Sequence, residues 1–246
     1  MLYPSYPEIR DRLAQVAREH PNVAQVYVLG QSHVGRPIEA LRLSGGAEDD
    51  PAGLFLGGVH GVEKVGVAMV LRLVDELLAH HKGPSPKSPL NGRQVWLVPL
   101  LNPDGYVRPQ RKNARGVDLN RNFGVGFSGQ SPLNRWRRWA FYPGPSAYSE
   151  PEPRALKGLF DRVHLAFSVS FHSFGGFINY PYGFSKTRPP DAALFTAIAR
   201  EMRRRQPYEK YRPRQLSWLY RPCGCLEDTL YESGGTLAFL IEMVAR

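Results

Sequence analysis

The chain has 246 residues, of which 42% are hydrophobic and 22% charged, and its formal net charge at pH 7 is +10. This length suits one α/β domain with a substantial core and is too short for two comfortable ones, so we expect a single domain over residues 1–246. The positive charge is spread along the chain without a nucleic-acid recognition motif, and no apolar run reaches the ~18 residues of a membrane span, so we expect no nucleic-acid partner and no membrane association.

Predicted strands and helices alternate from the N-terminus onward. Apolar periodicity predicts helices over residues 6–20, 65–78 and 190–205. Ser149 followed three residues later by Glu152 is typical of a capping box, which predicts a further helix from there to about Val163. Apolar runs predict strands over residues 23–29, 37–43, 54–58, 94–100, 165–171 and 236–241, the first two as a hairpin. The alternation favours an α/β fold whose twisted sheet is mixed but mostly parallel and is covered by helices on both faces.

Two residues that can bind a metal follow the predicted strand at residues 54–58. His60 and Glu63 stand three residues apart at the entrance of the next helix, so their imidazole and carboxylate groups can converge on one point. With one further histidine they would form the donor set of a catalytic zinc ion that keeps an open position. Alone, this spacing is weak evidence, because it often occurs by chance.

Two later strands also end in polar side chains. His172 follows the strand at residues 165–171, and Glu242 follows the one at residues 236–241. Because ligands of open α/β sheets collect beyond the carboxyl ends of strands, these groups are positioned to converge with His60. A hydrogen-bonded rim histidine and a rim ion pair are the alternatives, and from these residues alone they stay open.

The motifs around these positions resemble those of the zinc carboxypeptidases of the carboxypeptidase A type, from Tyr6 to Glu242. The resemblance rests on four motifs: His60-x-x-Glu63, Ser170-Phe171-His172-Ser173, Asn102-Pro103-Asp104-Gly105 and Asp118-Leu119-Asn120-Arg121-Asn122. It implies the fold of that family and one zinc ion per chain. The same resemblance implies that His60, Glu63 and His172 are the zinc ligands.

The resemblance also implies roles in peptide hydrolysis for five other residues. Glu242 would be the catalytic base, and Arg111 would polarise the scissile carbonyl group. Asn120 and Arg121 would bind the free C-terminal carboxylate of a peptide substrate, which makes the protein an exopeptidase. Asp118 would orient a zinc-binding histidine.

Spacing from Glu242 extends the resemblance towards the C-terminus. The family has a mobile tyrosine 22 residues before the catalytic glutamate and an aspartate 14 before it, which here are Tyr220 and Asp228. The residue at the base of the specificity pocket lies 15 before it, which is Glu227. An acidic group there implies a preference for C-terminal Lys or Arg. The alternative is that Glu227 turns outward or pairs with an arginine such as Arg221, which would leave a neutral pocket.

Several positions depart from the family pattern. Phe174 stands where the family often has tyrosine, and Cys223-Gly224-Cys225 replaces a Ser-Gly run beside the pocket, where we expect the cysteines to act as small packing residues. Relatives continue beyond the catalytic glutamate with a further helix, which we expect this chain to lack.

Two other functions remain open on the same scaffold. One is a zinc amidase that cleaves cell-wall peptides, such as the γ-D-glutamyl bond next to diaminopimelate, and the other is a peptide-binding protein without activity. Two cysteines only one residue apart and an N-terminus without a signal-peptide pattern indicate a cytoplasmic protein. The oligomeric state is open, and a monomer is favoured.

Overall fold

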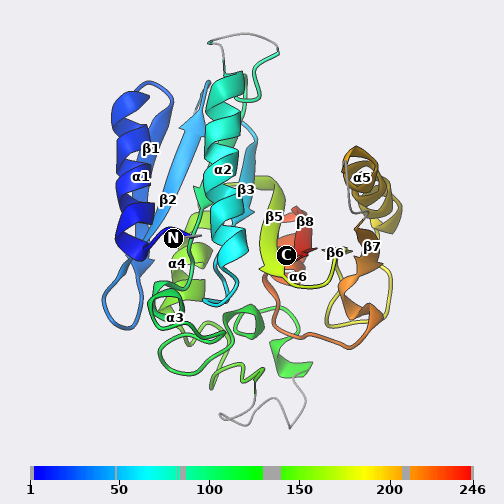
Figure 1. The fold of residues 1–246 in the computed structure, drawn as a ribbon. Helices are drawn as coiled ribbons and strands as arrows, with labels where there is room; N and C mark the ends of the chain where they lie inside the picture. The colour runs from blue at the N-terminus through cyan, green and yellow to red at the C-terminus, as the bar shows by residue number, and fades with distance from the viewer. Residues whose placement is uncertain are drawn as a thin grey trace.

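The computed structural model of the chain describes residues 3–47, 49–81, 83, 87–129, 140–206 and 211–244. Within these residues, one sheet has the strand order β1-β2-β4-β3-β5-β8-β6-β7 (Figure 1). Its strands are β1 (Ala24–Gln31), β2 (Pro37–Ser44), β3 (Ala52–Leu56), β4 (Gln94–Val98), β5 (Leu165–Ser173), β6 (Phe177–Tyr180), β7 (Arg212–Gln215) and β8 (Leu237–Met243). The six predicted strands are therefore confirmed, each with ends within two residues of the prediction.

The helices are α1 (Tyr6–Glu19), α2 (Lys64–His80), α3 (Pro103–Val107), α4 (Pro151–Phe160), α5 (Ala192–Arg205) and α6 (Leu226–Gly234), with short 3-10 turns at η1 (Leu119–Arg121), η2 (Phe127–Gly129) and η3 (Leu216–Trp218). The helices predicted from apolar periodicity are confirmed as α1, α2 and α5. Four elements were not predicted: α3, α6, β6 and β7. Each is short, and three of them have five residues or fewer, which is too short for a hydrophobic period to stand out.

The capping box predicted at the start of α4 is wrong. Glu150 is the N-cap residue, and no side chain caps the helix. Pro151 begins the helix because its ring already holds a helical φ and it has no N–H to satisfy. Ser149 donates a hydrogen bond to the Glu150 carboxylate (2.9 Å), while Glu152 accepts one from Asn113 Nδ2 (3.1 Å). The serine and the glutamate of the expected pair therefore bind other groups.

The strand directions place several strand ends at one edge of the sheet. Four of the seven neighbouring pairs are parallel, so the sheet is mixed and mostly parallel as predicted. The parallel pairs include β3 with β5 and β5 with β8. The carboxyl ends of these three strands consequently lie side by side, which is where an α/β sheet normally carries its ligands.

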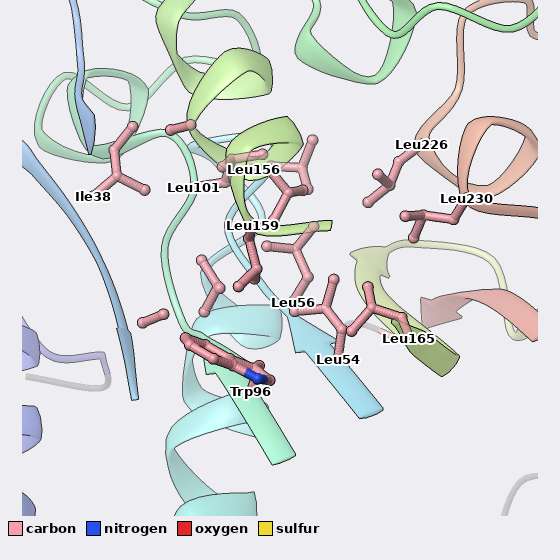
Figure 2. Close-up of a cluster of buried hydrophobic side chains, with 14 of the residues drawn as sticks. Ile38, Leu54, Leu56, Trp96, Leu101, Leu156, Leu159, Leu165, Leu226 and Leu230 are labelled. Atoms are coloured by element: carbon pink, nitrogen blue, oxygen red, sulfur yellow. The ribbon is translucent and has the colours of Figure 1, made fainter. Parts of the chain in front are cut away.

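Helices cover both faces of the sheet, also as predicted. On one face α4 and α6 pack against β3, where Leu54 and Leu56 are fully buried beside Leu156 and Leu230 (Figure 2). Side chains alternate along a strand, so Phe55 points to the other face, where it packs in the cluster formed with α1 and α2. None of the helices in the described ranges has both the length and the apolar character needed to cross a membrane.

Candidate active site

Three of the predicted site residues lie at the carboxyl ends of neighbouring parallel strands. His172 and Glu242 are the second-to-last residues of β5 and β8, and the strand register pairs them directly. His60 lies in the loop that follows β3. Since β3, β5 and β8 run in the same direction, the three side chains meet at one edge of the sheet.

The loop between β3 and α2 brings Glu63 back towards His60. Glu63 is the N-cap residue of α2, and its backbone N–H donates to the carbonyl oxygen of His60. Gly61 packs against α3 so closely that a Cβ at this position would overlap with the carbonyl group of Gly105. Glycine at this position therefore allows the tight turn that places the histidine and the glutamate together.

The side chains of His60, Glu63 and His172 converge, and all three are buried. His60 Nδ1 lies 2.8 Å from Glu63 Oε1, His172 Nδ1 lies 3.0 Å from Glu63 Oε2, and the two Nδ1 atoms are 3.2 Å apart. Ligand atoms about 2.1 Å from a tetrahedral zinc ion lie roughly 3.4 Å from one another. Two imidazole nitrogens that face each other across a buried carboxylate thus fit the donor set of a zinc ion.

The charge state of Glu63 agrees with a ligand role. Burial by itself would raise the pKa of this carboxyl group, but the neighbouring His60 and His172 outweigh it and hold the pKa below its ordinary value. A metal ligand has to be deprotonated, so the surroundings favour the form that binds a cation.

Asp118 holds the other side of the His60 ring. Its Oδ1 lies 3.0 Å from His60 Nε2, and its Oδ2 accepts from Arg111 Nε at 3.0 Å. Burial would raise the pKa of Asp118, but Arg111 and His60 outweigh this effect and hold the pKa well below its ordinary value. The carboxylate therefore fixes the orientation of the ring, as expected for the partner of a metal-binding histidine.

Asn120 and Arg121 lie on η1, directly after Asp118, whose side chain accepts from the Asn120 N–H (3.1 Å). Arg121 Nη2 donates to Tyr220 Oη at 2.8 Å, although Arg121 is buried and Tyr220 is 47% exposed. Asn120 Oδ1 accepts from the N–H of Leu226 at 2.9 Å, which ties η1 to the start of α6. An amide and a guanidinium group fixed in this way can receive a carboxylate.

A pocket of about 190 Å³ connects these groups. Seven of the ten predicted site residues line it: His60, Arg111, Asn120, Arg121, His172, Tyr220 and Glu242. Glu63, Asp118 and Glu227 lie behind the wall, in contact with residues that line it. Burial raises the pKa of Glu242, and Glu63 adds to the effect, against the opposing charges of His172, His60 and Arg111.

A sequence model for zinc carboxypeptidases matches residues 9–245. The chain belongs to this family. Carboxypeptidase A2 of Rattus norvegicus is 27% identical over 98% of this chain and 62% of its own length, and carboxypeptidase B of Astacus astacus is 29% identical over 77% and 67%. The carboxypeptidase A structure from Helicoverpa armigera superposes with a TM-score of 0.88 at 27% identity, over 99% of this chain and 65% of that one. The chain therefore spans about three fifths to two thirds of the length of these relatives.

Membership in the family makes zinc the cofactor, and the fold of the family is confirmed. His60, Glu63 and His172 are the residues that would hold the ion, since their ligand atoms meet at the edge of the sheet where β3 and β5 end.

Glu227 does not turn outward, so this part of the alternative is wrong. The residue is on α6 and only 1% exposed. Its Oε1 accepts from Ser170 Oγ at 2.6 Å, and its Oε2 lies 3.5 Å from Asn120 Nδ2. The carboxyl group is thus buried beneath the pocket wall, in contact with Asn120, which lines the pocket.

The two cysteines are buried, and one of them does more than fill space. Cys225 lines the pocket, and its Sγ lies 3.6 Å from Arg121 Nη1. Burial raises the pKa of the Cys225 thiol well above its ordinary value, so the group is a neutral thiol at pH 7. Phe174, which replaces the tyrosine of many relatives, also lines the pocket, and it is 81% exposed.

Sequence reasoning missed a group of pocket residues on β6 and η3. They are Phe177, Asn179, Leu216 and Trp218. The one signal that could have found them is Asn179, a polar residue in the run Phe-Ile-Asn-Tyr, which otherwise resembles an apolar strand. Because β6 and η3 were not predicted, the sequence offered no prediction of where these residues lie relative to the sheet.

Proposed function

We propose that the protein is a zinc-dependent carboxypeptidase, which removes the C-terminal residue of a peptide that ends in a free carboxylate. The observation that supports this most directly is the composition of one pocket. Two candidate zinc ligands and a carboxylic acid line it at the ends of β5, β8 and the loop after β3, and an amide and a guanidinium group line it from η1. The groups proposed for hydrolysis and those proposed to bind the terminal carboxylate thus line the same pocket.

Glu242 is the proton carrier in this proposal. Bound zinc supplies a Lewis acid that lowers the pKa of water towards ~7 and polarises a carbonyl group. Glu242 accepts the proton of the attacking water and then gives it to the amine that leaves. Burial raises the pKa of Glu242 above its ordinary value, which is the direction that favours a group that both takes and returns a proton.

The remaining polar groups act at the scissile peptide bond and at the terminal carboxylate of the substrate. Arg111 lines the pocket while Asp118 and Glu63 hold its guanidinium group, so it can stabilise the negative charge that develops on the scissile carbonyl oxygen. Asn120 and Arg121 bind the terminal carboxylate, and the exposed Tyr220 closes over it. A substrate anchored by its last carboxylate is cut one residue from its end.

We also propose a preference for C-terminal Lys or Arg. Glu227 supports this, because its carboxyl group is buried beneath the wall near Asn120, next to the place where the terminal carboxylate binds. Its negative charge favours a cation in the pocket over an apolar side chain.

The test combines metal analysis with a panel of peptides. We expect one zinc ion per chain and the release of free amino acid from peptides with a free C-terminus, fastest for those ending in Lys or Arg. The same peptides with an amidated C-terminus should be poor substrates. Glu242→Gln is expected to keep its zinc and to lose at least about a hundredfold in kcat, the usual contribution of a positioned general base.

Other outcomes would support the other two functions. Cleavage of a γ-D-glutamyl–diaminopimelate peptide without release from ordinary peptides would favour the cell-wall amidase. Full zinc content with no hydrolysis of any peptide would favour a binding protein. The cytoplasmic location and the monomeric state remain predictions, which cell fractionation and gel filtration would check.

A further inference from the structure

Asn179 is a polar residue in the middle of β6, between Ile178 and Tyr180, and it is 5% exposed. Its side chain lines the active-site pocket. The amide oxygen Oδ1 is buried, and no described residue gives it a hydrogen bond. A buried amide oxygen in this state destabilises the folded protein, so its presence in the wall of a binding pocket needs an explanation.

The strand register places Asn179 at a defined depth. Across the sheet, His172, Glu242 and Phe177 form one row, and two residues along each strand Ser170, Leu240 and Asn179 form the next. Paired residues, and residues two apart on one strand, point to the same face of a sheet. The row of Asn179 therefore lies on the catalytic face, roughly 7 Å from the row that contains His172 and Glu242.

The carboxylate of Glu227 on α6 is a second acceptor, held by a residue of this row. Ser170 holds the carboxyl group of Glu227 with its hydroxyl (2.6 Å), and Leu240 is the residue between Ser170 and Asn179. Leu240, which is paired with Asn179 across the sheet, has an apolar side chain without a donor, and no described residue donates to Asn179 Oδ1. A donor for the Asn179 oxygen would have to come from a molecule inside the pocket.

We propose that Asn179 is a specificity-determining residue, whose amide oxygen accepts a hydrogen bond from the ammonium or guanidinium group of a C-terminal Lys or Arg. This inference rests on the proposed carboxypeptidase function and adds the contact that recognises the side chain. A peptide cut at the row of His172 and Glu242 places its last side chain towards the row of Asn179. Only a long side chain with a terminal donor reaches that oxygen, and the charge of Glu227 favours a donor that is positive.

The experiment compares two variants whose side chains branch at Cγ as asparagine does, on matched substrates. Asn179→Leu removes the acceptor, and Asn179→Asp keeps an acceptor oxygen in place. Blocked dipeptides ending in lysine and in norleucine, its apolar counterpart, give a ratio of kcat/KM values. We expect Asn179→Leu to lower the lysine to norleucine ratio at least about tenfold, the usual effect of losing a hydrogen bond to a charged group, whereas Asn179→Asp keeps or raises it. Asn22→Leu, at an exposed position before β1, is the matched control and should leave the ratio unchanged.

The melting temperature of Asn179→Leu gives a second readout, which distinguishes a role in substrate recognition from a structural role. If the oxygen has no internal partner, Asn179→Leu melts at the same temperature as the wild type or higher. A clear fall in melting temperature would show that the amide is used inside the protein and would overturn the inference.

The remaining outcomes separate this inference from the proposed function. Hydrolysis of both dipeptides with an unchanged ratio in Asn179→Leu overturns the role of Asn179 and leaves the carboxypeptidase intact. If no dipeptide is cleaved, the proposed function fails. The role of Asn179 is then tested by equilibrium binding of free lysine and free norleucine to the zinc-loaded protein. Tighter binding of lysine that Asn179→Leu abolishes supports the role of Asn179, and equal binding of both amino acids overturns it.

Discussion

His60 links the two halves of the site through its two ring nitrogens. Nδ1 faces Glu63 and His172, where a metal would bind, and Nε2 faces Asp118, which also holds Arg111. One buried carboxylate thereby orients both a candidate metal ligand, His60, and the cation proposed to stabilise the oxyanion, Arg111. The orientations of the His60 ring and of the Arg111 guanidinium group therefore both depend on Asp118.

The role of Arg121 can be tested with a conservative change. Arg121→Lys keeps the charge but loses the planar pair of donors that can bind a carboxylate on two sides. We expect kcat/KM on peptides with a free C-terminus to fall at least about tenfold, mainly through a higher KM, because a hydrogen bond to a charged group contributes about 1.5–3 kcal/mol. Steady-state kinetics on one peptide as the acid and as the amide check this. An equal loss on both forms would contradict binding of the carboxylate by Arg121.

Individual residues differ in how well the sequence predicts them. His60, Glu63 and His172 could be predicted because short motifs and strand ends mark them, and the structure brings them together. The burial of Glu227 against Ser170, and the exposure of Asn179 to the pocket, depend on how α6 and β6 pack on the sheet. That packing joins segments more than fifty residues apart, and no local pattern records it.

At the scale of elements, the first turn of α4 buries two carboxyl groups side by side. Glu150 and Glu152 are both fully buried, and Asn113 Nδ2 donates to each of them, at 2.8 and 3.1 Å. His33 Nε2 also lies 2.8 Å from Glu150 Oε2. Burial raises the pKa of Glu152 from 4.5 to about 7, whereas hydrogen bonds from Asn113 and His33 outweigh burial and lower that of Glu150.

This arrangement predicts a pH dependence of stability between about pH 4.5 and 7. Folded protein keeps the proton on Glu152 up to about pH 7, while the unfolded chain loses it near pH 4.5, so stability falls as pH rises through this window. Glu152→Gln, which cannot ionise, should reduce the fall in melting temperature between pH 5 and 8. Some fall should remain, because burial also raises the pKa of Asp228 on α6 to about 7.

An exposed glutamate provides the matched control for this change. Glu201 on α5 pairs with Arg204 and Arg205 at the surface, and these hydrogen bonds lower its pKa, so it does not titrate in the window. Glu201→Gln should keep the slope of the wild type. A slope that is the same in all three proteins would show that Glu152 is ionised in the folded state at pH 5.

Element prediction succeeded where a segment is long enough to show its period. The apolar positions of α1 and α2 recur over several turns, and β3 to β5 are apolar runs between loop residues, so their ends were predicted to within two residues. The capping box failed because Glu150, and not Ser149, is the N-cap residue, so α4 begins one residue later than the serine suggested. β6 and β7 have only four residues each, and their place in the sheet comes from pairing with β8 and with each other.

At the scale of the molecule, the sheet directly positions two of the site residues, His172 on β5 and Glu242 on β8. β8 lies between β5 and β6, so Glu242 has a strand on each side and is paired with His172 and Phe177. The proposed base is consequently positioned by backbone hydrogen bonds on both sides. The candidate metal ligands lie on β5, in the loop after β3 and at the start of α2, so a bound ion would add a further link among these three elements.

Zinc is therefore expected to stabilise the whole fold. A ligand that binds only the folded state at about a thousandfold excess over its Kd contributes roughly 4 kcal/mol, and each kcal/mol shifts the melting temperature of a domain of this size by about 2–4 °C. Removing the metal with a chelator should lower the melting temperature by about 10 °C, and adding zinc should restore it. Glu242→Gln should show the same zinc-dependent shift as the wild type, because Glu242 is not a ligand, whereas His172→Gln should lose most of it. A shift that survives in His172→Gln would mean that the ion binds elsewhere in the protein.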